Sequence, residues 1–320
     1  MVTVDHRPLA GPAVVGMPAR PANPARPIWM FARDVCALAR PQFWPVSLLP
    51  YYTGFLLATH RLVPTADQLP RLLIGGLVAG PLVWLAVLAI NDAYDLPGDL
   101  RNPRKAGTPL TTGRLTPQLV RRIAAISAAI AVAVASTVGL YFAVGTLIAL
   151  TLGWAYSAPP IRLKTRPGAD VAANALALGA LGPMSGWAAL GSPAGFPWVM
   201  CVQGTLVGVA LYIPTTLADY RADVASGFDT IAVRLGLRRA YVVGYAAWVA
   251  AAACCVVLAA TDTMIPRHML GFEAVIVPGL VAAYHLLLGR TQTFARITAV
   301  AFLFLIPSGV FALTYTGVLG

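Results

Sequence analysis

The chain has 320 residues, of which 58% are hydrophobic and only 11% are charged. Soluble domains carry about 25% charged residues, so this composition excludes a soluble protein and indicates a polytopic membrane protein. The net charge of +11 does not indicate nucleic-acid binding, because most basic residues occupy one set of loops between apolar segments.

Residues 1–35 are expected to form a mobile cytoplasmic tail, and residues 36–320 are expected to form a single membrane domain. Pro, Ala and Arg recur in residues 19–27 of the tail. The tail has no long apolar core, and a secretory signal requires one of roughly 7–15 residues.

Nine apolar segments follow, and they are predicted to be the transmembrane helices of an all-α integral membrane protein. Most of them approach the roughly 20 apolar residues that one helical crossing needs. Glycine and proline inside several segments are compatible with this, since neighbouring helices can satisfy freed backbone groups. The predicted spans are 41–60, 71–92, 119–139, 141–157, 170–190, 197–218, 238–261, 269–289 and 294–318.

The distribution of basic residues predicts the orientation of these spans. The tail and alternate loops hold 20 of the 23 lysine and arginine residues, whereas the opposite loops hold only Arg61, Arg71 and Arg267. Cytoplasmic loops carry the excess of basic residues, so the N-terminus is expected in the cytoplasm. The protein is expected to be a multi-pass protein of a bacterial cell membrane.

The first of two aspartate clusters follows the second predicted span. Asn91, Asp92 and Asp95 are spaced three and four residues apart, which places their oxygens on one face of a helix. Pro97-Gly98 is expected to end that helix, so that Asp99 comes from the following loop.

The second cluster follows the sixth predicted span, on the same side of the membrane. Asp219 and Asp223 are one helical turn apart, Gly227 is expected to end the helix, and Asp229 lies on the turn beyond it. The two clusters hold half of the 12 acidic residues, which argues against ordinary solvated loop acids. Carboxylates near hydrocarbon are costly, and Mg²⁺ combines one or two of them with water and phosphate oxygens. The clusters therefore predict two Mg²⁺ ions and a diphosphate substrate.

Basic residues surround these clusters and are suited to phosphate. Arg and Lys hold phosphate oxygens through charge-assisted hydrogen bonds and can neutralise a leaving diphosphate. The alternative is that they serve topology alone. Tyr156 precedes one of the basic loops, where its ring could shield a carbocation. The basic candidates are Arg101, Arg104, Lys105, Arg114, Arg162 and Lys164.

From about Arg40 to Gly320 the chain resembles the UbiA superfamily of intramembrane prenyltransferases. Residues 91–99 and 219–227 match the family's two aspartate-rich motifs, and residues 156–164 are similar to its tyrosine-and-lysine segment. Residues 108–114 resemble the family's RPLxxGR loop, with Thr108 where the family has Arg. That departure puts one expected diphosphate contact in doubt, and Lys105 or Arg104 could substitute for it.

The resemblance implies nine helices in one bundle around a central cavity that is open to the cytoplasmic side and to lipid. It also implies Mg²⁺-assisted ionisation of an allylic prenyl diphosphate, transfer of the prenyl group to an aromatic or lipid acceptor, and release of diphosphate. The expected catalytic residues are Asp92, Asp95, Asp219, Asp223, Tyr156 and Lys164, and the expected metal ligands are Asn91, Asp92, Asp95, Asp99, Asp219 and Asp223. The expected diphosphate-binding residues are Arg101, Arg104, Lys105, Arg114, Arg162, Lys164 and Asp229, and Arg40 is expected to face the acceptor.

Two other functions remain open from the sequence. Some members of the superfamily act as terpene cyclases, which cyclise the prenyl chain without an acceptor. A cation transporter would instead need polar or charged residues at the bilayer midplane, and the predicted spans hold few of them. Release of diphosphate in the absence of an acceptor distinguishes the cyclase from the transferase.

Overall fold

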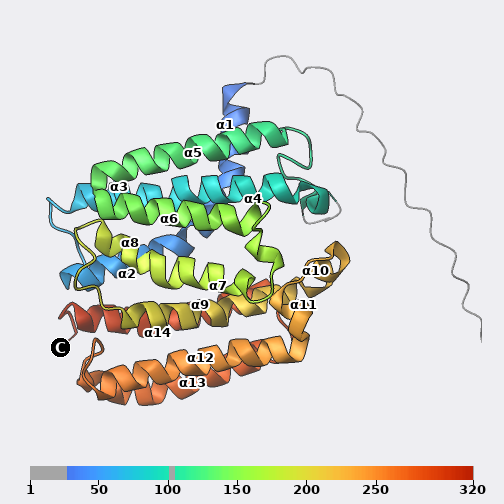
Figure 1. Cartoon of the computed structure of the whole chain (residues 1–320). Helices are drawn as coiled ribbons and strands as arrows, with labels where there is room; N and C mark the ends of the chain where they lie inside the picture. The colour runs from blue at the N-terminus through green and yellow to red at the C-terminus, as the bar shows by residue number, and fades with distance from the viewer. Residues whose placement is uncertain (1–26, 101–104, 320) are drawn as a thin grey trace, which may run out of the picture.

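The computed structural model describes residues 27–100 and 105–319, and every regular element in these ranges is a helix. Each of the nine predicted segments is helical (Figure 1). Most ends lie within three residues of the prediction, and the second helix extends further, to Asp99. The helices are α2 (Trp44–Thr59), α3 to α4 (Leu69–Asp99), α5 (Pro117–Val138), α6 (Leu140–Ser157), α7 to α8 (Ala169–Ala188), α9 (Val199–Ala218), α12 (Leu237–Ala260), α13 (Leu270–Leu288) and α14 (Phe294–Tyr315).

Seven helices in the described ranges are long and apolar enough to cross a membrane. The two predicted spans outside this set are α2, which has 16 residues, and the stretch from α7 to α8. Several helices follow one another in space as they do in the chain: α5 packs against α4 and α6, and α13 packs against α12 and α14. The fold is therefore a bundle of membrane helices.

A further helix, α1 (Ile28–Ala39), precedes the first predicted span. It occupies part of the segment that was expected to be a mobile tail, and residues 1–26 of that tail lie outside the described ranges. Figure 1 shows α1 running across the direction of α4, against which it packs. The helix ends at Arg40, whose left-handed backbone conformation precedes Pro41 and a short helical turn, η1 (Pro41–Phe43).

Two of the long helices contain a π-helical turn. In the second span, η2 (Val78–Leu82) separates α3 (Leu69–Leu77) from α4 (Val83–Asp99), and it contains Pro81. In the fifth span, η5 (Ala177–Leu181) separates α7 (Ala169–Leu176) from α8 (Gly182–Ala188). Such turns hold one more residue than an α-helical turn and are frequent at functional sites.

Helices α2 and α8 approach each other until their backbones touch. A Cβ atom added to Gly186 would lie 1.7 Å from the carbonyl oxygen of Tyr51, and one added to Gly54 would lie 1.9 Å from that of Pro183. Small residues allow this approach in membrane bundles, where packing rather than the hydrophobic effect drives association. Only glycine fits either position.

Short helices connect the spans at the end of the bundle where α4 and α9 finish (Figure 1). They carry or adjoin most of the residues singled out in the sequence. They are η4 (Leu163–Thr165), α10 (Tyr220–Ser226) and α11 (Ile231–Leu235). A further short helix, η6 (Arg267–Met269), lies at the other end of the bundle, between α12 and α13.

Candidate active site

Asp92 lies at the centre of the first aspartate cluster and is 4% exposed. Arg40 donates a hydrogen bond to its Oδ1 atom, and Lys105 Nζ lies 3.5 Å from the same oxygen. Lys105 Nζ also donates to Asp99 Oδ2 at 3.3 Å. One cation therefore bridges two carboxylates, and a second cation reaches Asp92 from the end of α1.

The helix that carries these carboxylates runs further than the sequence suggests. Pro97 lies inside α4, which continues through Asp99. The expectation that Asp99 comes from a loop is therefore wrong. Proline lacks the N–H that would donate to the carbonyl four residues earlier, yet the helix continues for two residues beyond Pro97.

Asp95 faces a second pair of cations, which come from the segment after α6. Lys164 Nζ donates to Asp95 Oδ1, and Arg162 Nη2 donates to the same oxygen at 3.3 Å. The side-chain amide of Asn91 completes this group. In the orientation that satisfies its hydrogen bonds, its nitrogen donates to Asp95 Oδ2 at 3.2 Å. Its oxygen then accepts from Lys164 Nζ at 3.1 Å and from Ser157 Oγ at 3.1 Å.

Lys164 lies in η4, beyond the end of α6. The side chain is 8% exposed. Burial lowers the pKa of Lys164, and the neighbouring Asp95 carboxylate opposes this shift. A buried ammonium beside a carboxylate is held in place by that pairing, which fixes the amine at the cluster.

The second cluster lies where α9 ends and α10 begins. Asp219 caps both helices, and Asp223 lies one turn further along, with its amide donating to the Asp219 carbonyl at 3.0 Å. Gly227 ends α10 in the left-handed conformation, as predicted. Thr230 Oγ1 donates to Asp223 Oδ2 at 3.1 Å. Burial, with Asp219 and Asp170 nearby, raises the pKa of Asp223 to about 6.

Two contacts join the parts of the chain that carry the two clusters. The hydroxyl groups of Tyr156, on α6, and Tyr212, on α9, share a hydrogen bond. The Arg162 guanidinium, which contacts Asp95, lies 5.3 Å from the centre of the Phe228 ring, just beyond α10. The clusters therefore flank a common region at one end of the bundle.

Other predicted site residues have different partners. Arg114 Nε donates to Asp34 Oδ1 at 3.0 Å, and its Nη2 donates to the Gly107 carbonyl at 3.2 Å. Asp229 pairs with Arg234 on the surface. Arg101 and Arg104 lie outside the described ranges.

The oxygen-rich clusters fit Mg²⁺, which prefers carboxylates supplemented by water and phosphate oxygens. Within residues 27–100 and 105–319, no three His, Cys, Asp or Glu side chains form a group that could hold a metal ion by themselves. The raised pKa of Asp223 reflects burial and neighbouring negative charge, a setting that a cation would relieve. The residues therefore fit a Mg²⁺ ion that retains water or phosphate ligands, and they do not form a closed cage.

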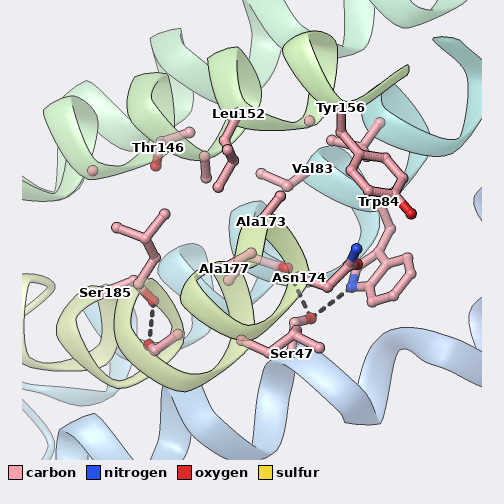
Figure 2. Close-up of a pocket in the computed structure, with 18 of the residues that line it drawn as sticks. Ser47, Val83, Trp84, Thr146, Leu152, Tyr156, Ala173, Asn174, Ala177 and Ser185 are labelled. Atoms are coloured by element: carbon pink, nitrogen blue, oxygen red, sulfur yellow. Dashed lines mark hydrogen bonds between the residues drawn. The ribbon is translucent and has the colours of Figure 1, made fainter. Parts of the chain in front are cut away.

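An apolar cavity of about 270 Å³ begins beside the first cluster. Asn91, Tyr156 and Ser157 line it at the cluster end, and Phe142 and Ser185 line it deeper in the bundle. Figure 2 shows α6 on one side of the cavity and the stretch from α7 to α8 on the other. Trp84 lines it as well, and its indole Nε1 donates to Ser47 Oγ at 2.7 Å.

Sequence reasoning missed two acidic residues around the site. Asp34 is buried against Arg114, and Asp170 Oδ2 accepts from the Ile231 amide at 3.0 Å. Both are acids placed at or beside apolar segments, and such a position is the signal that could have drawn attention to them.

The profile of the UbiA prenyltransferase family matches residues 47–306 of this chain. The lycopene elongase/hydratase of Haloferax volcanii is 29% identical over 266 residues, covering 78% of this chain and 79% of that protein. The 33 kDa chain of bacteriochlorophyll synthase from Rhodobacter capsulatus is 29% identical over 210 residues, covering 64% of this chain and 67% of that protein. The structure of a UbiA homolog from Archaeoglobus fulgidus bound to GPP and Mg²⁺ superposes with a TM-score of 0.68 at 22% identity, covering 88% and 98% of the two chains.

Proposed function

Because the chain belongs to the UbiA prenyltransferase family and is therefore a membrane prenyltransferase, we propose that it transfers the prenyl group of an allylic prenyl diphosphate to an aromatic or lipid acceptor, with release of diphosphate. The observation that supports this proposal is that the first aspartate cluster, with its basic partners, adjoins the apolar cavity. Asn91 and Tyr156 lie where the two adjoin, and Asn91 contacts both Asp95 and Lys164. A prenyl diphosphate has the same two parts.

Two Mg²⁺ ions are proposed, one for each aspartate cluster. Asn91, Asp92, Asp95 and Asp99 would hold one ion, and Asp219 and Asp223 would hold the other. Bound Mg²⁺ supplies Lewis-acid stabilisation of the negative charge that develops on the departing diphosphate. The UbiA homolog bound to GPP and Mg²⁺ is consistent with this ligand class.

The cations at the first cluster are proposed to serve the diphosphate. Lys105, Arg162 and Lys164 contact carboxylates, and each reaches its partner from a loop or short turn rather than from a long helix. Their ammonium and guanidinium groups can bind phosphate oxygens while remaining near the carboxylates. Arg40 is proposed to lie close enough to the reacting end of the donor to orient an acceptor, because it contacts Asp92.

The apolar cavity is proposed to hold the prenyl chain. The residues that line it are mostly apolar, so a hydrocarbon chain that enters the cavity has apolar surroundings. The rings of Tyr156 and Trp84 line the cavity, and aromatic faces attract cations, so they can stabilise an allylic carbocation. Water would compete with the acceptor for that cation, and an apolar enclosure keeps it out.

The remaining helices are proposed to complete a nine-span bundle with the active site on the cytoplasmic side. Helix α2 and the stretch from α7 to α8 pack closely against each other and against spanning helices. The loops at the end of the bundle that carries both aspartate clusters hold most of the basic residues. Under the positive-inside rule that end faces the cytoplasm.

The function is tested by incubating the purified protein with Mg²⁺ and an allylic diphosphate, and analysing the products by mass spectrometry. The acceptor pool contains lycopene, a tetrapyrrole and quinone precursors. The first two are chosen because the names of the relatives above contain lycopene and bacteriochlorophyll. A prenylated acceptor is the expected product. Diphosphate release with a cyclic hydrocarbon and no acceptor would instead identify a terpene cyclase.

Cysteine labelling tests the sidedness. Single cysteines at Ala106, Arg166 and Ser226, in a variant that lacks the four native cysteines, are expected to resist an impermeant thiol reagent applied to intact cells. All three positions are exposed in the structure, so burial would not explain the protection. Cysteines at Ala66 and Ala194, which are exposed in loops at the other end of the bundle, should react. The reverse pattern would contradict the orientation.

A bulkier residue at Gly145 is expected to shorten the donor that the enzyme accepts. Gly145 lines the cavity, and a Cβ atom added there meets nothing within 4 Å, so a leucine side chain would extend into the space. Overpacking costs about 1–3 kcal/mol, so Gly145→Leu should lower kcat/KM for the longest accepted donors by about 5- to 150-fold. Dimethylallyl diphosphate should be affected least.

The matched control is Gly279→Leu, at an exposed position of α13 where an added Cβ also meets nothing within 4 Å. It should leave the donor preference unchanged. An equal loss for donors of every length in Gly145→Leu would show that this cavity does not hold the donor chain.

A further inference from the structure

Helix α1 carries a buried acid that the proposed reaction does not use. Asp34 is 1% exposed, and Arg114 Nε lies 3.0 Å from its Oδ1 atom. A buried carboxylate is costly unless it is paired and hydrogen-bonded. Separating the two partners would leave an uncompensated buried charge. The pair therefore joins α1 to the segment 105–114, which contains Arg114.

That segment is also the one that presents Lys105 to the carboxylates. Arg114 Nη2 donates to the Gly107 carbonyl at 3.2 Å, so the guanidinium that pairs with Asp34 also holds the backbone two residues after Lys105. Within the segment, Thr111 Oγ1 donates to the Lys105 carbonyl at 2.6 Å. Contacts from Asp34 through Arg114 therefore reach the backbone at Gly107, two residues from Lys105, and Thr111 holds the Lys105 carbonyl within the same segment.

Packing supports the same connection. Leu38, on α1, shares a hydrophobic cluster with Leu110 of the segment, with Leu115 directly after it, and with Ala89 and Ala93 of α4. Arg40, directly after α1, contacts Asp92, which Lys105 also contacts. Helix α1 is thus connected to Arg40 and to Lys105, the two cations that reach Asp92 among the described residues.

We propose that Asp34 is a positioning residue: through Arg114 it fixes the segment 105–114 so that Lys105 lies where the diphosphate of the donor binds. The inference rests on the proposed function in one respect, the binding of diphosphate by Lys105. It assigns Arg114 to Asp34 and the Gly107 carbonyl, in place of the direct diphosphate contact that the sequence suggests. Asp34 acts before any chemical step, by reducing the freedom that Lys105 must lose on binding.

The test measures binding of geranyl thiolodiphosphate without turnover. In this inert analogue, sulfur replaces the oxygen that joins the prenyl chain to the diphosphate. Isothermal titration calorimetry with Mg²⁺ is performed on the full chain in detergent, together with its melting temperature. The variants are Asp34→Asn, Lys105→Ala and the double variant. Asp67→Asn is the matched control, because Asp67 is exposed in a loop at the other end of the bundle.

We expect Asp34→Asn and Lys105→Ala each to raise the Kd about tenfold or more. In the Lys105→Ala background, Asp34→Asn should change the Kd less than twofold, because its effect passes through Lys105. Asp67→Asn should bind as the unaltered protein does. If the effects of the two variants multiply, or if folded Asp34→Asn binds normally, Asp34 does not position Lys105.

A second variant keeps the test decisive if Asp34→Asn does not fold. Arg114→Lys retains a positive charge for Asp34 but lacks the second guanidinium nitrogen, which donates to the Gly107 carbonyl. It should show the same rise in Kd and the same loss of effect in the Lys105→Ala background, and its failure to do so would refute the proposal. Normal binding by Lys105→Ala itself would instead overturn the diphosphate role of Lys105, and with it that part of the proposed function.

Discussion

Asp92→Asn and Asp219→Asn are each expected to lower prenyl-transfer turnover by about 10²–10³-fold, the range lost when one preorganised electrostatic partner of a reaction is removed. Each cluster would hold its own Mg²⁺, so neither can replace the other. An amide keeps the shape of the carboxylate but not its charge, and the variants should still insert and purify normally. Turnover is measured with saturating donor over a range of Mg²⁺ concentrations.

The Mg²⁺ titration separates lost metal binding from a damaged fold. Partial recovery of turnover at high Mg²⁺ is expected for both variants, because a weakened site can be filled by mass action. Asp67→Asn, at the other end of the bundle, serves as the control and should behave as the unaltered protein does. Near-normal turnover in either cluster variant at ordinary Mg²⁺ concentration would contradict the two-metal proposal.

Lys164→Ala is expected to reduce kcat/KM for the donor about ten- to a hundredfold. A charge-assisted hydrogen bond contributes roughly 1.5–3 kcal/mol, and this amine is held at the cluster by Asp95 and Asn91. Lys164→Arg should recover only part of the loss, since a planar fork replaces a point charge in a buried position. Initial rates at varied donor concentration provide the measurement.

Arg166→Ala is the matched control for Lys164. Arg166 lies two residues further along the same segment, is exposed, and donates to the Pro160 carbonyl. It also contributes to the positive charge of the loop, so it tests the view that these residues serve topology alone. Unchanged donor kinetics in correctly oriented Lys164→Ala protein would support that view and remove Lys164 from the site.

The sequence predicts the helices and both aspartate clusters because these depend on local patterns. Apolar length identifies the spans, and spacings of three and four place the carboxylates of Asp92 and Asp95 on one side of a helix. Gly227 ends its helix as predicted for the same reason. Pro97 is the exception: a proline near the end of a helix removes one hydrogen bond without ending the helix.

The partners of those carboxylates are not predictable in this way. Arg40 and Asp92 are 52 residues apart, and Asp34 and Arg114 are 80 apart. Each basic residue fits both a topological role and a binding role, and only the folded arrangement shows which carboxylate it contacts. The pairing of Tyr156 with Tyr212 likewise depends on how α6 lies beside α9.

The π-helical turn in the second span determines which way the first aspartate cluster points. Each residue of a helix advances the side-chain direction by about 100°, so one additional residue in Val78–Leu82 rotates everything after it by that angle. Before the turn, Gly75 faces Tyr51 of α2 at close range. After it, Trp84, Val87, Leu88 and Asn91 line the cavity as a single stripe. An uninterrupted α-helix of the same composition would keep its contact with α2 and direct Asn91 about a quarter of a turn away from the cavity. The additional residue sets the direction of the α4 side chains about the helix axis independently of α3. One spanning helix can therefore pack by one face and present the candidate site residues on another.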